Sequence, residues 1–244
     1  MTGLSFHVKA WAAWAPGRET AAAWLQWAGQ PAQSSDTDHK PVPVLLRRRV
    51  SPLGQQALKA AWSLPDSATG RLIACSRHGE FGRTLSILDS LAVRTGTSPA
   101  DFTLSVHNAL LGLLSIARGN RQGHTMIAAG TESFGFGLLE AVSCLADSPT
   151  YPVVLVYFDE PLPPPYDVFD QPALDQSAPD PIAIALTLSA TEGAPVILTT
   201  TQAESPPDPT GALTFMRVLL GAAPHATTTG EHFTWHWRSG HAPD

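Results

Sequence analysis

The segment from Phe102 to Glu140, FTLSVHNALLGLLSIARGNRQGHTMIAAGTESFGFGLLE, decides the fold of this chain. Its pattern predicts a short strand around Thr103 to Val106, a tight turn, a helix from Ala109 to Ala117, a strand from Thr125 to Ala129 and a helix from Phe136 to Ala146. The first of these helices is apolar on nearly every side, which is typical of a helix buried in a core or an interface. The turn before it, Ser105–Asn108, lies where an enzyme of layered architecture would hold a nucleophile.

The elements outside this segment alternate between strands and helices. Predicted strands cover Leu4–Ala15, Arg71–Ser76, Tyr151–Asp159, Ile182–Ala190, Val196–Thr201 and His232–Arg238, and predicted helices cover Thr20–Gly29, Ser51–Trp62, Phe81–Arg94 and part of Asp208–Leu220. The stretches 30–43 and 160–181 are proline-flanked or proline-rich and are predicted as loops. This alternation, with apolar central strands, predicts an α/β layered sheet. Strands 151–159 and 182–190 have no helical pattern between them, so we expect an antiparallel pair at one edge.

Composition excludes several classes of function. The chain has 244 residues, of which 43% are hydrophobic and 15% charged, and this is enough to bury the core of one domain. A net charge of −6 gives no reason to expect binding to nucleic acid or to a membrane surface. The sequence shows no signal peptide and no apolar run of membrane-spanning length, so the cytoplasm is the expected location. The low charge favours a large protein–protein interface, because interface cores are depleted in charged residues.

Motifs for independent chemistry are weak. The stretch Gly130–Gly135 resembles a nucleophile elbow, but its spacing departs by one residue from G-x-S-x-G. His232 and His236 share one face of a predicted strand without a third ligand nearby in sequence, so no metal site is expected. Cys75 lies inside the apolar run RLIACS, where a cysteine is usually a small buried hydrophobe rather than an activated thiolate.

The residues Ser105, His107 and Asn108 are the serious candidates for a site. One interpretation is structural: Asn108 caps the following helix and His107 forms a local hydrogen bond. The other is functional, because the backbone N–H groups at a helix start point toward whatever lies there. The pattern favours capping and leaves substrate contact open.

At these residues the chain resembles the N-terminal half of the thiolase-like β-ketoacyl synthases. The matching pieces are SVHNALLGLLSIARG, MIAAGTESF, VVLVYFDE and IAIALTLSA. More narrowly, LLRRRVSPLGQQAL, CSRHGEFGRTLSIL and FTLSVHNALLGLLSIARG resemble the short chain length factors of bacterial aryl polyene clusters. The resemblance implies an α/β thiolase-like half: a five-stranded mixed sheet with helices on both faces and an antiparallel strand at one edge. It implies a ketosynthase-like N-terminal domain in residues 1–190, with residues 191–244 as a short C-terminal extension packed on it.

Two departures from active ketosynthases decide the expected role. Placing Gly112 on the motif glycine puts Ala109 at the nucleophile position, and a shift of one residue puts Asn108 there; neither is a cysteine. The C-terminal half that supplies the decarboxylation histidines of ketosynthases is also expected to be missing. The resemblance therefore implies a non-catalytic chain length factor that pairs with an active β-ketoacyl synthase, walls its acyl pocket and limits polyene length. It implies no cofactor and no metal, with acyl carrier protein reached through the synthase.

The candidate residues follow from this expectation. No catalytic residue is predicted. Pocket or interface candidates are Ser105, His107, Asn108, Leu110, Leu111, Leu113, Leu114, Phe81, Leu85 and Leu88, and carrier-contact candidates are Arg47, Arg48, Arg49 and Arg77. Two alternatives stay open: a stand-alone acyl-transfer enzyme that uses Cys75 or the pair Ser105/His107, and a scaffold that binds the carrier protein.

Overall fold

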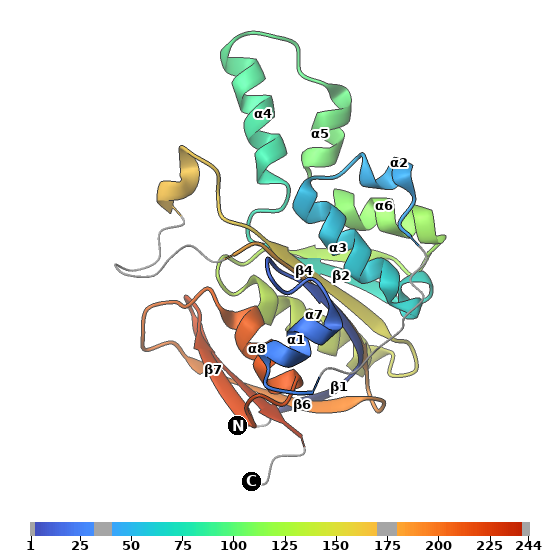
Figure 1. Ribbon diagram of the computed structural model, residues 1–244, viewed down its shortest axis with the longest axis vertical. Coiled ribbons are helices and arrows are strands. Elements are labelled where there is room, and N and C mark those ends of the chain that lie inside the picture. The colour runs from blue at the N-terminus through green and yellow to red at the C-terminus, as the bar shows by residue number, and fades with distance from the viewer. Residues whose placement is uncertain (1–2, 32–40, 170–179, 241–244) are drawn as a thin grey trace.

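Two buried strands, β4 (Val153–Asp159) and β5 (Ile182–Ser189), form the centre of the fold. We describe the protein from a computed structural model, which places residues 3–31, 41–169 and 180–240 (Figure 1). Every residue of β4 is buried, and so is every residue of β5 before Ser189. The two strands are rich in β-branched residues that suit a sheet covered on both faces. They pair antiparallel, as predicted, from Val153 opposite Leu188 to Asp159 opposite Ile182.

The described part of the chain forms one eight-stranded mixed sheet in the order β3-β2-β4-β5-β1-β6-β8-β7. The further strands are β1 (Leu4–Trp14), β2 (Arg71–Cys75), β3 (His124–Ile127), β6 (Ala194–Gln202), β7 (His225–Thr229) and β8 (Phe233–Ser239). β3, β2 and β4 are parallel, and all other neighbours are antiparallel. β3 and β7 are therefore the two open edges of the sheet.

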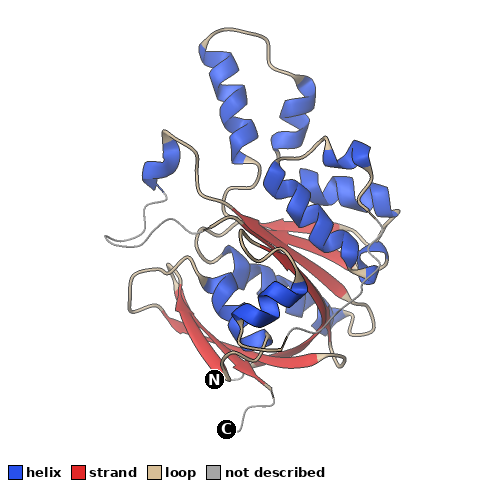
Figure 2. Cartoon of the chain, in the orientation of Figure 1, coloured by secondary structure: helices blue, strands red, loops and turns tan. Residues whose placement is uncertain are grey.

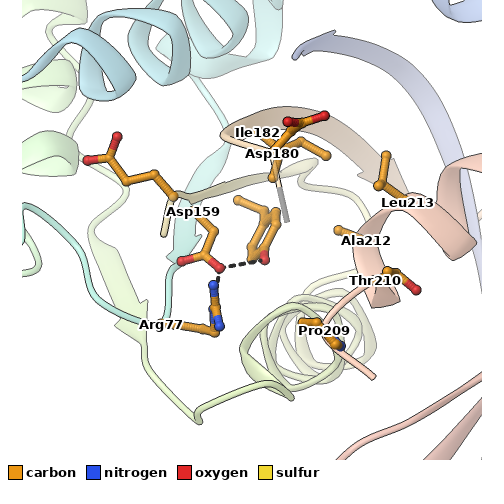
Figure 3. Close-up of a pocket in the computed structure, with 10 residues that line it drawn as sticks. Arg77, Asp159, Asp180, Ile182, Pro209, Thr210, Ala212 and Leu213 are labelled. Atoms are coloured by element: carbon orange, nitrogen blue, oxygen red, sulfur yellow. Dashed lines mark hydrogen bonds and ion pairs between the residues drawn. The ribbon is translucent and has the colours of Figure 1, made fainter. Parts of the chain in front are cut away.

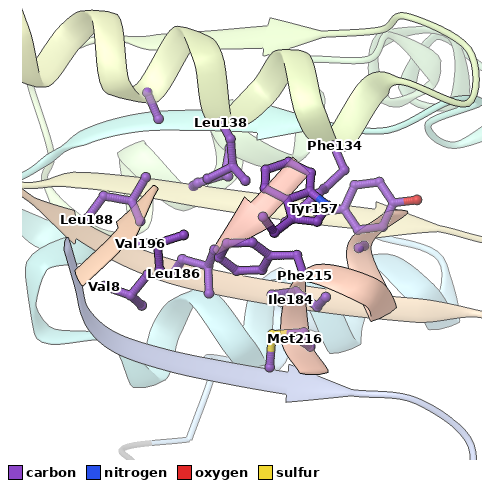
Figure 4. Close-up of a cluster of buried hydrophobic side chains, with 14 of the residues drawn as sticks. Val8, Phe134, Leu138, Tyr157, Ile184, Leu186, Leu188, Val196, Phe215 and Met216 are labelled. Atoms are coloured by element: carbon purple, nitrogen blue, oxygen red, sulfur yellow. The ribbon is translucent and has the colours of Figure 1, made fainter. Parts of the chain in front are cut away.

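Helices cover both faces of the sheet (Figure 2). One face carries α1 (Ala21–Trp27), α7 (Ser133–Asp147) and α8 (Gly211–Leu219), and the other carries α2 (Val44–Arg47), α3 (Pro52–Ser63) and α6 (Ala109–Arg118). On the first face Phe134, Tyr157 and Phe215 pack together between α7, α8 and the strands (Figure 4). Two apolar cores, one on each face, thus hold the sheet between them.

Capping residues explain several of the helix boundaries. Thr20 and Ser51 accept hydrogen bonds from the N–H groups of Ala23 (3.2 Å) and Gly54 (3.0 Å), and so fix the predicted starts of α1 and α3. Gly119 ends α6 with a positive φ of 65°, a conformation that glycine adopts without strain.

The predicted strand count was wrong, although the α/β class is confirmed. The prediction was five strands with an antiparallel strand at an edge, whereas β5 lies inside the sheet because β1 pairs with its other side. β1 also pairs with β6, β6 pairs with β8, and β8 pairs with β7 at the edge of the sheet. The division at residue 190 stays a prediction about domains, but strands from both sides of it are hydrogen-bonded in the same sheet.

The predicted strand around Thr103–Val106 was also wrong. Most of these residues belong to α5 (Pro99–Ser105). Ser98 is the N-cap of this helix, and its hydroxyl accepts from the N–H of Asp101 at 3.3 Å. The Ser-Pro start is the same signal that predicted α3, and here it outweighs the β-branched residues. Within the predicted loop 160–181 lies a short 3₁₀ helix, Tyr166–Phe169, and another 3₁₀ helix covers Pro65–Ala68. Residues 32–40 and 170–179 of the two predicted loops lie outside the described residues.

The helix that is apolar on nearly every side, α6, is buried within this chain on one side only. In α6 the side chains of Leu110, Leu111 and Leu114 are at most 1% exposed, whereas Ile116 is 81% exposed. Beside α6, the helices α4 (Phe81–Ala92) and α5 project from the sheet as a hairpin (Figure 1). We call residues 81–105 the arm. In the described part of the chain no single helix has the length and apolarity to cross a membrane; α5 and α6 reach them only together, as a pair bent by 95°.

Candidate functional site

The turn between α5 and α6 borders a hollow at the open edge of the sheet. His107 and Asn108 line it together with His124, Met126 and Ala128 from β3 and the residues after it, and its volume is about 330 Å³. The three residues from the β3 side alternate along the chain, so they present their side chains to one face. The structure thus brings the predicted candidates together with a sheet edge that sequence reasoning did not connect to them.

His107 packs on the backbone at the base of the arm. Gly79 has a positive φ of 59°, and a Cβ at this position would lie 3.1 Å from the imidazole ring. The ring atom Nε2 of His107 is buried and has no hydrogen-bond partner among the described residues. The residues just before α4 and just after α5 therefore meet at the rim of the hollow.

Asn108 occupies the N-cap position of α6 without capping it by its side chain. Among the described residues its side chain accepts no hydrogen bond from the first turn, and its carbonyl instead accepts from the N–H of Gly112 at 3.0 Å. The predicted side-chain cap is therefore not formed, and the amide of Asn108 lines the hollow. Ala109, the first residue of α6, offers no side chain that could react.

The structure gives no support to the two nucleophiles considered for a stand-alone enzyme. The Cys75 side chain is fully buried in β2, and this burial, together with the nearby Asp159 carboxylate, raises the pKa of its thiol well above the usual range. The Ser105 hydroxyl donates to the carbonyl of Phe102 at 2.8 Å, so its proton is directed to the backbone rather than to an imidazole base.

The apolar candidates fall into two groups by exposure. Leu110, Leu111 and Leu114 are core residues against α3 and the sheet. Phe81, Leu85 and Leu113 are half-buried, and Leu88 on the arm is 42% exposed. Only the second group offers surface to another molecule.

The four candidate arginines also divide. Arg47, Arg48 and Arg49 are exposed, at and just after the end of α2. Arg77, in contrast, is ion-paired with Asp159, and both side chains are less than 10% exposed. The Tyr157 hydroxyl donates to the same carboxylate at 3.3 Å (Figure 3). Arg77 thus lies beside a small internal cavity of about 20 Å³ rather than on the surface.

Burial dominates the electrostatics of this Arg77 cluster. It raises the pKa of Tyr157 well above its ordinary value, and the Asp159 carboxylate acts in the same direction. The pKa of Glu160 is also raised, first by burial and then by the carboxylates of Glu80 and Asp159. The cavity beside this cluster shares no lining residue with the hollow, so the cluster is separate from the candidate site.

Glu132 is an important residue whose role sequence reasoning missed. Its side chain is 1% exposed, and its carboxylate accepts from the N–H of His232 (3.0 Å) and of Phe233 (2.9 Å) and from the indole of Trp235 (3.1 Å). The ring Nδ1 of His232 is 2.8 Å from the same carboxylate. The Gly-Thr-Glu motif was visible in the sequence, but its partners lie 100 residues or more away along the chain. This contact fixes the turn after β3 to the start of β8.

Comparisons with known proteins show which family the chain is similar to. Residues 24–238 match the profile of the family described as "Beta-ketoacyl synthase, N-terminal domain". A chain in the complex of the ketosynthase ApeO with its chain length factor ApeC from Xenorhabdus doucetiae is 27% identical, with a TM-score of 0.81, and the match covers 96% of this chain and 99% of that one.

More distant structures share the fold. The ishigamide ketosynthase/chain length factor is 15% identical with a TM-score of 0.62, over 82% of this chain and 68% of that one. A chain of the AntDE:AntF complex, a type II PKS acyl-carrier protein with its ketosynthase, is 14% identical with a TM-score of 0.63, over 83% and 70%. No curated protein sequence matches the chain.

Proposed function

The chain belongs to the family of β-ketoacyl synthase N-terminal domains, and on that premise we propose that it is a non-catalytic chain length factor. In this role it pairs with an active β-ketoacyl synthase and helps to shape the pocket in which an aryl polyene or related polyketide-type acyl chain grows. The pair works in the cytoplasm and receives its substrate from an acyl carrier protein that docks mainly on the synthase.

The observation that carries the proposal is the start of α6. Claisen condensation on this fold needs a thiol to hold the acyl chain, and the resemblance to ketosynthases assigns that position to Ala109 or Asn108, neither of which has one. The buried Cys75 cannot replace it, because burial keeps its thiol protonated. The acyl chain must then be attached to another subunit, and this chain can contribute only shape.

A sheet edge beside the hollow supports a partner at this place. The N–H groups of Leu72 and Ser76 donate to the carbonyls of Gly123 (3.3 Å) and Ile127 (3.2 Å), so alternate residues of β3 bond to β2. His124 and Met126 then direct their backbone groups to the open edge. An unpaired edge is a template for a strand of another chain. The other edge, β7, has the polar sequence HATTT and is the weaker candidate.

Exposed apolar side chains extend this surface. Phe102, Val106 and Ile116 are 65%, 46% and 81% exposed, and they lie on α5, the turn after it and α6. Exposed apolar residues that gather on neighbouring elements mark interaction sites more often than chance. We therefore place the synthase against β3, the hollow and the arm.

Co-expression with a cognate ketosynthase tests the pairing. We expect a stable complex, and mass spectrometry should detect the acyl chain on the synthase alone. Met126→Pro removes an edge N–H, so it should abolish the complex. The isolated chain should still unfold cooperatively, at a somewhat lower melting temperature, because Met126 also packs against the core. Met126→Leu is the matched control and should retain the complex. An acyl adduct on this chain, or a complex unaffected by Met126→Pro, contradicts the proposal or its interface.

The pocket residues are tested by product length. Leu88→Ala and Leu85→Ala remove side-chain volume from a partly exposed apolar surface and so enlarge the space beside it. We therefore expect longer products with little change in melting temperature. Leu110→Ala is the control, because its side chain is 1% exposed in the core and its loss should mainly destabilise the chain, by about 2–5 kcal/mol. Unchanged products from the two arm variants would remove the arm from the pocket wall.

A second candidate function is a scaffold that recruits the acidic carrier protein. The observation in its favour is the exposed run Arg47–Arg49 beside Leu45, which is 77% exposed. Charge reversal by Arg47→Glu with Arg48→Glu should weaken carrier binding several-fold, and Arg121→Glu, at an exposed position in the α6–β3 loop, should not. Equal binding by all variants would exclude this role.

A further inference from the structure

The arm has few apolar contacts, among them the edge-to-face contact of Phe81 with Tyr166, whose ring centroids are 5.2 Å apart. Neither α4 nor α5, both described in full, contains a buried side chain. Leu91, Val93 and Phe102 are more than half exposed. The arm nevertheless projects from the body of the molecule beside α3 and α6 (Figure 1). A segment with few apolar contacts depends on polar contacts for its orientation.

One guanidinium group connects the arm to its surroundings. Arg83, in the first turn of α4, donates from Nη1 to the carboxylate of Asp101 on α5 at 2.6 Å. From Nη2 it donates to the carbonyl of Arg49, just after α2, at 3.0 Å. Its Nε lies 3.9 Å from the carboxylate of Glu80, and only 18% of its side chain is exposed. A single side chain therefore touches α5, the residue before α4 and the segment between α2 and α3.

Glu80 carries the connection to the main body. Its side chain is 5% exposed, and its two oxygens accept from the hydroxyl (2.8 Å) and the N–H (3.1 Å) of Ser51. Ser51 is the N-cap of α3, which packs on the central strands. Gly54 permits this approach, because a Cβ there would lie 2.6 Å from the Glu80 carboxylate. The chain of contacts Arg83–Glu80–Ser51 thus ties the arm to the rigid part of the fold.

We infer that Arg83 is the positioning residue of the arm: it sets the angle at which the arm stands beside the hollow, and through it the length of chain that the pocket accepts. The inference rests on the proposed function, in which the arm forms part of the wall. Arg83 needs its planar fork for this role, because Nη1 donates to the Asp101 carboxylate while Nη2 donates to the Arg49 carbonyl. A lysine has one point charge and can satisfy only part of the arrangement.

Hydrogen exchange on the isolated full chain tests the first half of the inference. In Arg83→Gln we expect the amides of residues 81–105 to exchange about ten-fold faster or more, while those of β4 and β5 keep their rates. Arg83→Lys should lie between Gln and the native residue, and Asp101→Asn should reproduce part of the effect. Arg94→Gln is the matched control, at an exposed position in the loop at the tip of the arm, and should leave the exchange unchanged. Equal exchange in Arg83→Gln and Arg94→Gln overturns the inference.

Product analysis of the complex with a ketosynthase tests the second half. Arg83→Gln should broaden or shift the distribution of chain lengths at an unchanged melting temperature of the core, with partial restoration in Arg83→Lys. Faster exchange with an unchanged product distribution would overturn the role in chain length. If the native chain forms no complex at all, the proposed function fails, whereas the exchange result still decides whether Arg83 positions the arm. The two failures are therefore distinguishable.

Discussion

At the scale of single residues, the start of α6 has no side chain that could serve as the nucleophile of a ketosynthase. Ala109 begins a helix whose preceding turn, His107 and Asn108, borders an open hollow. Helix starts favour developing negative charge, and this geometry alone would suit a nucleophile. The resemblance to ketosynthases assigns the nucleophile position to Ala109 or Asn108, and neither of these residues carries a thiol. The thiol of Cys75, which was considered as an alternative nucleophile, lies in the apolar core instead.

The Cys75 thiol should make the free energy of unfolding fall as the pH rises into the alkaline range. Burial raises its pKa in the folded chain, so the folded state keeps a proton that the unfolded state releases above the ordinary value of 9.0. Its contribution is complete below that pH and falls as the pH rises toward the folded pKa, by up to about 1.4 kcal/mol per pH unit. We expect Cys75→Ala to lose less stability than the native chain between pH 8 and pH 11 in urea titrations.

The control for this prediction is Cys144→Ala, because Cys144 is only partly buried. Its variant should follow the native pH dependence more closely than Cys75→Ala does. Parallel curves for all three proteins would show that Cys75 does not hold its proton in the folded state.

Glu132 is the residue on which the C-terminal hairpin depends. Its buried carboxylate accepts from four groups of His232, Phe233 and Trp235. Glu132→Gln replaces an acceptor oxygen by a donor NH₂ group, so one side faces two donors without an acceptor. We expect a loss of about 2–3 kcal/mol in the free energy of unfolding. Glu192→Gln removes a surface pair with Lys9 in which the glutamate side chain is 66% exposed, so its urea midpoint should stay close to that of the native chain. Similar urea midpoints for both variants would contradict this role.

At the scale of elements, α6 has two faces with different functions. Leu111 is fully buried against α3 and the sheet, and Leu111→Ala should lower the free energy of unfolding by about 2–5 kcal/mol. Ile116 is 81% exposed on the opposite side, and Ile116→Ala should change stability by less than about 0.5 kcal/mol. Denaturation of the isolated chain checks both values.

The same pair separates folding from assembly. With a ketosynthase present, Ile116→Ala should weaken the complex in a pull-down or by calorimetry, because the exposed side of α6 belongs to the surface that we assign to the partner. An Ile116→Ala variant that binds as well as the native chain would place the partner elsewhere.

At the scale of the whole molecule, residues 194–239 complete the sheet. β6 pairs with β1, and β8 brings Trp235 and Trp237 into the core, where they are 2% and 1% exposed. α8 packs Phe215 against the same core. We expect a chain of residues 1–190 to lack a cooperative unfolding transition, because β1 would lose a neighbour on one side and the aromatic core would open to water.

Circular dichroism during thermal unfolding measures this directly. The full chain should unfold in one transition. Trp235→Phe is the control, since it keeps an aromatic ring at this position but loses the indole hydrogen bond to Glu132. It should unfold cooperatively at a lower temperature. A cooperative transition in residues 1–190 alone would instead support the predicted boundary at residue 190.

The sequence by itself determined most of the local elements and the absence of a cysteine at the start of α6. Apolar runs identified β4 and β5, Ser51 with Pro52 identified the start of α3, and the missing cysteine at Asn108–Ala109 indicated a subunit without its own nucleophile. The Ser98-Pro99 start of α5 carried the same kind of signal, and the β-branched residues that follow it masked it. These features depend on side chains a few residues apart, which is the range over which propensity and periodicity act.

Only the tertiary structure decided which strands are neighbours and which charges are paired. β1 lies between β5 and β6, Glu132 meets Trp235 across 103 positions, and Arg77 is buried against Asp159 rather than offered to a carrier protein. It also showed that the arm is exposed and tied to the body through Arg83. The physical reason is that sheet order and buried polar pairs arise from contacts between distant parts of the chain, on which local patterns carry no information.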